Sequence, residues 1–137
     1  MGLALLIIMA AAVMYSVLIG APGRGGLLIP VNEGPVKKLA PIEAAELQIQ
    51  ESAPPRYMVQ VTYGLRNGCI KPAGFTTRRV GRAIEVKVYV EEPSDQKTVC
   101  TQVYGTGTHT VDLGTDFQKG EIYRVEVNSQ PITFTGQ

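Results

Sequence analysis

The residues with the most reactive side chains in this chain are two cysteines and a single histidine. In a chain exported from the cytoplasm, an even pair of cysteines indicates one disulfide, and we expect Cys69 and Cys100 to be bonded. Such a bond would close a loop of about 32 residues and stabilise the fold by on the order of 3.7 kcal/mol. The alternatives are two free buried thiols or half of a metal site.

His109 is the one imidazole available as a base, and we expect it to be an exposed residue of a turn or strand edge. No serine has the context that a Ser–His–Asp arrangement requires. Three carboxylates that could ligate calcium lack the spacing of a calcium loop; they are Asp112, Asp116 and Glu121. The sequence therefore predicts no catalytic residue, no cofactor and no metal, and a binding protein rather than an enzyme, although an enzyme without a recognisable motif stays an alternative.

The segment 64–82 is the most suggestive stretch for binding, because its nineteen residues carry five cations, no carboxylate and no alternating pattern. Long loops in compact domains are often functional. We interpret it as a loop, pinned by the disulfide, that recognises an anionic or protein ligand through Lys71, Phe75, Arg78, Arg79 and Arg82. The alternative is a solvated loop whose arginines pair with Glu85, Glu91 and Glu92. A net charge of only +1 argues against nucleic acid as the partner.

These candidate residues follow an N-terminal stretch, residues 1–23, that has no charged side chain. Residues 3–19 are almost entirely apolar, and roughly 20 such residues in a helix span the ~30 Å hydrocarbon layer of a bilayer. We expect a transmembrane or signal helix that contacts the membrane through residues 3–19. No basic residue precedes it and no favourable cleavage site follows it, so an uncleaved anchor is favoured. A cleaved signal peptide or a buried core helix is the alternative.

Residues 24–44 are rich in proline and glycine, which predicts a linker without regular structure. Arg24, Lys37 and Lys38 follow the apolar segment and would favour an inside location for the rest of the chain. The cysteine pair favours the outside. We predict a domain anchored to the membrane outside the cytoplasm, or a secreted domain if the segment is cleaved.

Residues 45–137 have a hydrophobic period of two, which is typical of half-buried strands. The clearest case alternates Ile84, Val86, Val88 and Val90 with polar residues. Seven such runs lie near residues 47–50, 57–63, 84–91, 99–103, 111–113, 123–128 and 132–134. Turn-forming residues separate them, among them the Gly105–Gly107 tripeptide. The fold predicted is all-β, a seven-stranded antiparallel sandwich of residues 45–137.

Residues 111–127, Val-Asp-Leu-Gly-Thr-Asp-Phe-Gln-Lys-Gly-Glu-Ile-Tyr-Arg-Val-Glu-Val, resemble the corner between the fifth and sixth strands of fibronectin type III and related immunoglobulin-like domains. This resemblance implies an immunoglobulin-like sandwich. It also implies that Tyr123 is the corner tyrosine, its hydroxyl bonded to backbone near the turn, and that Phe117 fills the apolar corner position. The tryptophan common in the core of these domains is absent.

Together these patterns predict a membrane-tethered, extracytoplasmic β-sandwich that binds a ligand which the sequence does not identify. A second hypothesis is a loop-based inhibitor of an extracytoplasmic hydrolase, with residues 70–80 inserted into the active site of the enzyme. The two hypotheses differ in structure, because an inhibitor needs residues 70–80 to protrude as an ordered loop.

Overall fold

A computed structural model describes residues 34–137 of the chain. The predicted hydrophobic segment 1–23 and the first ten residues of the predicted linker lie outside the described residues. Within residues 34–137, no helix combines the length and the apolar character that crossing a bilayer requires.

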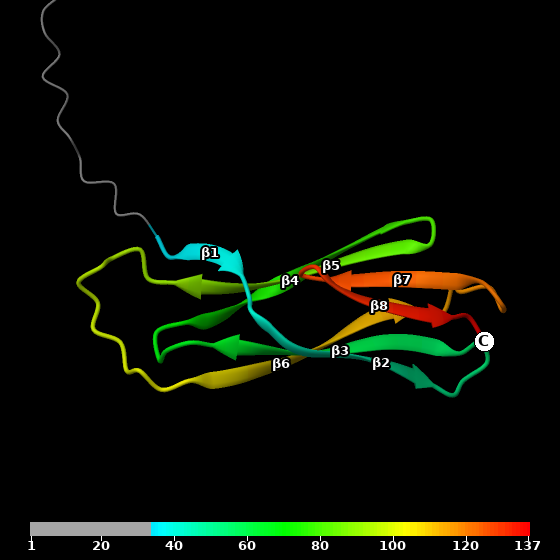
Figure 1. Cartoon of the computed structure of the whole chain (residues 1–137), viewed down its shortest axis with the longest axis horizontal. Helices are drawn as coiled ribbons and strands as arrows, with labels where there is room; N and C mark the ends of the chain where they lie inside the picture. The colour runs from blue at the N-terminus through cyan, green and yellow to red at the C-terminus, as the bar shows by residue number, and fades with distance from the viewer. Residues whose placement is uncertain (1–33) are drawn as a thin grey trace, which may run out of the picture. The chain divides into compact units, whose positions relative to one another are not determined.

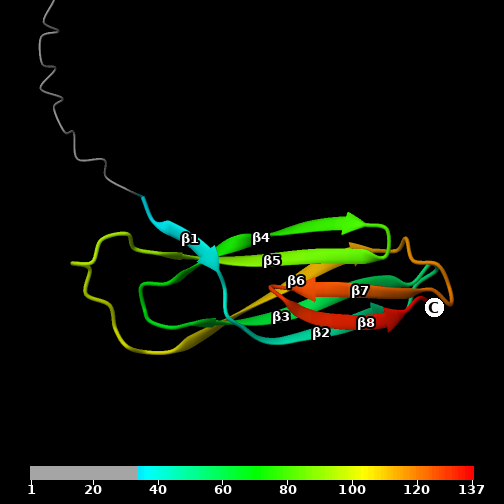
Figure 2. The same ribbon diagram turned by 45° about the horizontal axis from the view of Figure 1, so that its top comes forward.

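The described residues form a β-sandwich, as predicted, with eight strands in two sheets (Figure 1). One sheet is formed by β1 (Val36–Leu39), β4 (Lys71–Val80), β5 (Ala83–Glu92), β7 (Ile122–Val127) and β8 (Gln130–Thr135). The other has the order β2 (Ile42–Gln50), β3 (Arg56–Leu65) and β6 (Gly105–Gly114). Figure 2 shows the two layers from a second angle.

Alternation of side chains explains why these segments form a sandwich. In β3, β5 and β7 every second residue is buried, so each strand turns one row of apolar side chains toward the opposite sheet. Valines dominate the core: Val59, Val61, Val86, Val88, Val90, Val111, Val125 and Val127. Full burial of one valine contributes on the order of 1.5–3 kcal/mol, so this row is the main stabilising feature of the domain.

Four aromatic rings close one end of the core. Phe117 lies at the centre, with its ring centroid 4.5 Å from that of Tyr57, 4.9 Å from Tyr123 and 5.3 Å from Phe134. Tilted and edge-on contacts of this kind add to the stabilisation that burial of the rings gives. The cluster fixes the segment between β6 and β7 against both sheets.

The sheet that contains β5 departs from the antiparallel prediction, because β5 and β7 run parallel. A single strand, β6, separates them in the chain and belongs to the other sheet, so the chain returns to β5 in its original direction. β4 pairs with β5 along nearly its whole length. β1 and β7 must therefore share the opposite edge of β5, where β1 pairs with residues 89–92 and β7 with residues 83–86.

Asn128 fills the gap between β1 and β7 on this shared edge. Its side chain accepts a hydrogen bond from the Val88 N–H at 2.9 Å and donates to the carbonyls of Ala40 and Val88 at 2.8 and 2.9 Å. Its φ of 43° lies in the left-handed region, which asparagine tolerates better than most residues. The side-chain amide of Asn128 thus makes the hydrogen bonds that a strand backbone would otherwise make to Val88, at a position where neither β1 nor β7 pairs with β5.

Three sequence-based boundaries differ from the structure. β1 and the start of β2 lie within the predicted linker 24–44, because Pro35 and Pro41 flank a short edge strand instead of interrupting it. Residues 99–103 form no strand and belong to the connection between β5 and β6. The predicted break at residues 105–107 is part of β6, since Gly107 leaves room for a tyrosine ring: a Cβ there would lie 2.5 Å from the Tyr63 ring.

Candidate functional site

The segment 64–82, predicted to be a long loop, is mostly strand. β3 continues to Leu65, and β4 begins at Lys71 and pairs with β5 as far as Val80. β4 is exposed on nearly all of its length, so its side chains do not alternate between apolar and polar types. A bulge between Pro72 and Phe75, with Gly74 at φ 87°, weakens the pattern further. An edge strand of this kind resembles a loop at the level of sequence.

The three predicted arginines gather at the turn between β4 and β5, which we call the hairpin tip (residues 78–83). Arg78 pairs with Glu85 at 3.1 Å, as the alternative interpretation of the sequence had it, and Arg82 pairs with Glu121. Arg79 lies over the ring of Phe117, 4.6 Å from its centroid, and approaches Asp116 only to 4.0 Å. Arg79 therefore packs on the aromatic cluster, whereas Arg78 and Arg82 are exposed.

A shallow groove runs along the sheet surface beside the hairpin tip. Its exposed apolar residues are Val80 and Ala83, and two arginine–glutamate pairs border it: Arg78–Glu85 and Arg124–Glu126. Val80 is 67% exposed. Exposed ion pairs of this kind contribute little to stability.

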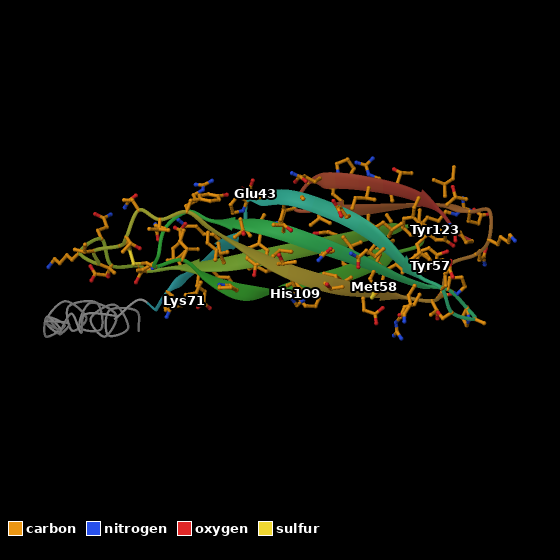
Figure 3. All side chains as sticks on the ribbon, turned by 90° about the horizontal axis from the view of Figure 1, so that it is seen from below. Glu43, Tyr57, Met58, Lys71, His109 and Tyr123 are labelled. Carbon is orange, nitrogen blue, oxygen red and sulfur yellow. A yellow bond between two sulfur atoms is a disulfide. The ribbon has the colours of Figure 1, made fainter. Side chains whose placement is uncertain are left out.

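Lys71 and Phe75 lie away from the hairpin tip, so the structure does not bring the five predicted binding residues together. Lys71 begins β4 at the opposite end of the strand, and Figure 3 shows it far from Tyr57 and Tyr123. Phe75 is 40% exposed and packs against His109, with ring centroids 4.3 Å apart. His109 is accordingly half-buried in β6 rather than exposed, and its Nε2 atom is buried without a hydrogen-bond partner.

The predicted disulfide is confirmed, with 5.4 Å between the Cα atoms of Cys69 and Cys100. It joins two irregular connections, residues 66–70 and 93–104, which together we call the disulfide end. The Gly68 N–H also donates to the Thr101 carbonyl at 2.9 Å. Sequence analysis missed that the longer connection exposes apolar side chains: Val99 is 95% and Val103 70% exposed. Their alternation with polar residues indicated a strand, which concealed this signal.

Tyr123 and Phe117, the predicted corner residues, contact each other across the start of β7. The Tyr123 hydroxyl accepts a hydrogen bond from the Gln118 N–H at 2.8 Å, and Phe117 is buried against its ring. The carboxylates considered for calcium have other partners. Asp112 bonds the Arg56 guanidinium, which, together with the Gly114 N–H, holds the pKa of that carboxyl below its usual range. Residues 34–137 contain no group of three or more side chains suited to hold a metal ion.

Comparison with known proteins supports the architecture. The family model of the ORF11 beta-sandwich domain matches residues 59–136, from the first half of β3 to just beyond β8. No curated protein and no solved structure matches the chain. Since the matched range covers more than half of the chain, and both sheets of the sandwich lie largely within it, the chain belongs to the ORF11 beta-sandwich domain family.

Proposed function

We propose that this chain is a membrane-tethered, extracytoplasmic β-sandwich that binds an acidic protein partner through its hairpin tip. The apolar segment 3–19 would anchor the chain in the membrane. The disulfide favours an oxidising compartment, because thiols are kept reduced in the cytosol. The proposed role of the domain is binding, because its hairpin tip exposes an apolar side chain beside two arginines.

One observation carries the choice of surface: Val80 stands in solvent between exposed arginines at the end of a hydrogen-bonded hairpin. Protein interfaces combine apolar anchors with arginines, which are enriched there, and charge complementarity selects the partner. Arg78 and Arg82 are the most exposed cations of the tip, with 75% and 65% of their side chains accessible, against 32% for Arg79. A partner surface that offers one apolar pocket and two carboxylates fits this arrangement.

The immunoglobulin-like type of the sandwich is part of this proposal. The hydrogen bond between Gln118 and the Tyr123 hydroxyl supports it, because a corner tyrosine of this kind is typical of those domains. The inhibitor hypothesis receives less support. It needs residues 70–80 to protrude as a loop, and β4 is paired with β5 over most of this range.

Site-specific cross-linking tests the proposal. A photoreactive amino acid replaces Val80 in the full chain, in the membranes in which the chain is naturally made. We expect one protein adduct, and the substitutions Arg78→Gln and Arg82→Gln together should reduce it about fivefold or more. Arg56→Gln is the matched control, since Arg56 pairs with Asp112 on the other sheet.

A second control places the photoreactive group at Thr108, an exposed residue of β6. An adduct that forms equally from Thr108, or one from position 80 that ignores both glutamine substitutions at the tip, would show that the hairpin tip is not the binding surface. Absence of any adduct from position 80 would lead to the same conclusion.

A further inference from the structure

The apolar side chains that the domain exposes are concentrated near one end. Five of the eight exposed large apolar residues among those described lie on β1 or on the connection 93–104, namely Val36, Leu39, Val99, Val103 and Tyr104. Two of them, Val99 and Val103, rank among the three most exposed. An exposed apolar group gathered on a loop indicates a surface that something covers.

The chain enters the domain at this same end. Gly34 and Pro35, the first described residues, line one groove together with Gly68, Cys69 and Pro93 of the disulfide end. The hairpin tip lies at the other end of β4 and β5, as Figure 1 shows. Ten residues of strand at about 3.3 Å each place the hairpin tip about 33 Å from the disulfide end.

The length of chain before Gly34 limits how far this end can lie from a membrane. If residues 3–19 span the bilayer, residues 20–33 are the whole connection to the domain. Coil statistics for fourteen residues give a typical end-to-end distance of roughly 20 Å. If the connection has that length, it is shorter than β4 and β5, and the disulfide end is the part of the domain that can lie next to the lipid.

The charges at the disulfide end suit the same neighbour. Arg66, Lys71 and Lys97 make no ion pair within residues 34–137. The connection 93–104 has one carboxylate, Asp95, which is engaged by the Lys97 N–H at 2.7 Å. Apolar side chains that project beside cations free of internal partners are the features by which interfacial segments bind lipid surfaces.

We infer that the disulfide end is a membrane-contact surface, in which Val99 and Val103 enter the headgroup region and the disulfide holds them in position. The inference rests on the proposed tether, because it needs residues 3–19 in the bilayer. The inference also gives the domain an orientation, in which the disulfide end contacts the membrane and the hairpin tip points away from it.

The absence of tryptophan from the chain allows a direct test. Val99→Trp and Val80→Trp each give the full chain one tryptophan, at either end of the domain and in an exposed position. Both variants are reconstituted in vesicles of phosphatidylcholine and phosphatidylglycerol with brominated acyl chains, which quench tryptophan only on contact. We expect V99W to lose about half of its emission and V80W to lose none, because an interfacial residue enters the acyl boundary.

The outcomes separate this inference from the proposed function. If the full chain floats with the vesicles but V99W is quenched no more than V80W, the membrane-contact surface is wrong and the tether stands. If V99W emission shifts to the blue without quenching, a protein surface such as a second copy covers Val99, which also overturns the inference. If the full chain does not float with the vesicles, the tether itself fails, and the inference fails with it.

Discussion

The amide of Asn128 offers the sharpest test of how this fold is held together. Val88 is almost fully buried, and its N–H group has the Asn128 side chain as partner on the edge of β5 that β1 and β7 share. Substitution by alanine removes that bond and the two that Asn128 donates to Ala40 and Val88. The Val88 carbonyl also accepts a hydrogen bond from the Ala40 N–H at 2.9 Å, but the Val88 N–H has no strand partner on this edge, because β1 pairs with residues 89–92 and β7 with residues 83–86.

The magnitude follows from the geometry. Three hydrogen bonds of good length contribute about 1 kcal/mol each, and a residue other than glycine or asparagine at positive φ adds about 1 kcal/mol, so we expect Asn128→Ala to cost about 4 kcal/mol. Asn128→Gly loses the same bonds but relaxes the backbone, so it should cost about 3 kcal/mol. For a domain of this size such losses are a large share of the total stability.

The assay is urea unfolding of residues 34–137, followed by far-ultraviolet circular dichroism. Both variants should lower the midpoint, with Asn128→Gly the less affected of the two. Ser129→Gly is a useful control, because Ser129 also has positive φ, at 76°, but offers no comparable set of hydrogen bonds; it should leave stability unchanged or raise it. The reasoning is refuted if the free energy of unfolding of Asn128→Ala lies within about 1 kcal/mol of that of the natural sequence, or if Asn128→Gly is less stable than Asn128→Ala.

Three further predictions concern stability. Replacing Cys69 and Cys100 with serine should cost about 3.7 kcal/mol by the chain-entropy relation, measured as the fall in unfolding free energy under oxidising conditions; a cost below about 1 kcal/mol would contradict it. Gly107→Ala should cost about 1–3 kcal/mol because its Cβ would meet a tyrosine ring, whereas Gly105→Ala, whose nearest neighbour lies at 3.9 Å, should be close to neutral in thermal unfolding. The pKa of the Asp112 carboxyl is lowered in the folded state, mainly because it accepts hydrogen bonds from the Arg56 guanidinium and, to a smaller extent, because it accepts one from the Gly114 N–H. Its contribution is therefore complete above the ordinary aspartate pKa of about 3.9 and is lost as the pH falls through the lower folded value. The difference in melting temperature between Asp112→Asn and the natural sequence should accordingly shrink on acidification from neutral pH, and a constant difference would contradict the assignment.

The elements that the sequence predicted well are those buried on one face. β5 was expected at residues 84–91 and spans Ala83–Glu92, because Ile84, Val86, Val88 and Val90 all turn inward. The disulfide was likewise accessible to prediction, since the chain has two cysteines and the compartment decides their state. In both cases the information is local or compositional.

The elements that sequence analysis misjudged are those whose structure depends on distant partners. β4 has one paired edge and little burial, so its residues carry no period, and its hydrogen bonds to β5 are invisible in the sequence. The opposite error occurred at residues 99–103, where Val99 and Val103 alternate with polar residues but find no strand to pair with. Alternation shows that a strand is feasible, and only a neighbouring strand makes it form.

The candidate binding surface was misjudged for a related reason, since charge content says nothing about pairing. Arg78, Arg79 and Arg82 were equivalent in the sequence, yet Arg79 lies on the ring of Phe117, which belongs to the connection between β6 and β7. Arg78 and Arg82 both have carboxylate partners that other elements supply. Three arginines that formed one cationic group in the sequence therefore divide, in the fold, into one packing residue and two exposed residues.

The two ends of the domain are stabilised by different interactions, and only one of them depends on an oxidising compartment. At the hairpin end, strand pairing and the aromatic cluster around Phe117 fix the structure without covalent help. At the other end, the connections 66–70 and 93–104 share the Gly68–Thr101 hydrogen bond and the disulfide. Reduction would thus loosen the disulfide end while the hairpin end keeps its contacts. The position of Val99 and Val103 therefore depends on an oxidising compartment, whereas the structure of the hairpin tip does not. Reduction should weaken a contact made by the disulfide end and leave one made by the hairpin tip unchanged.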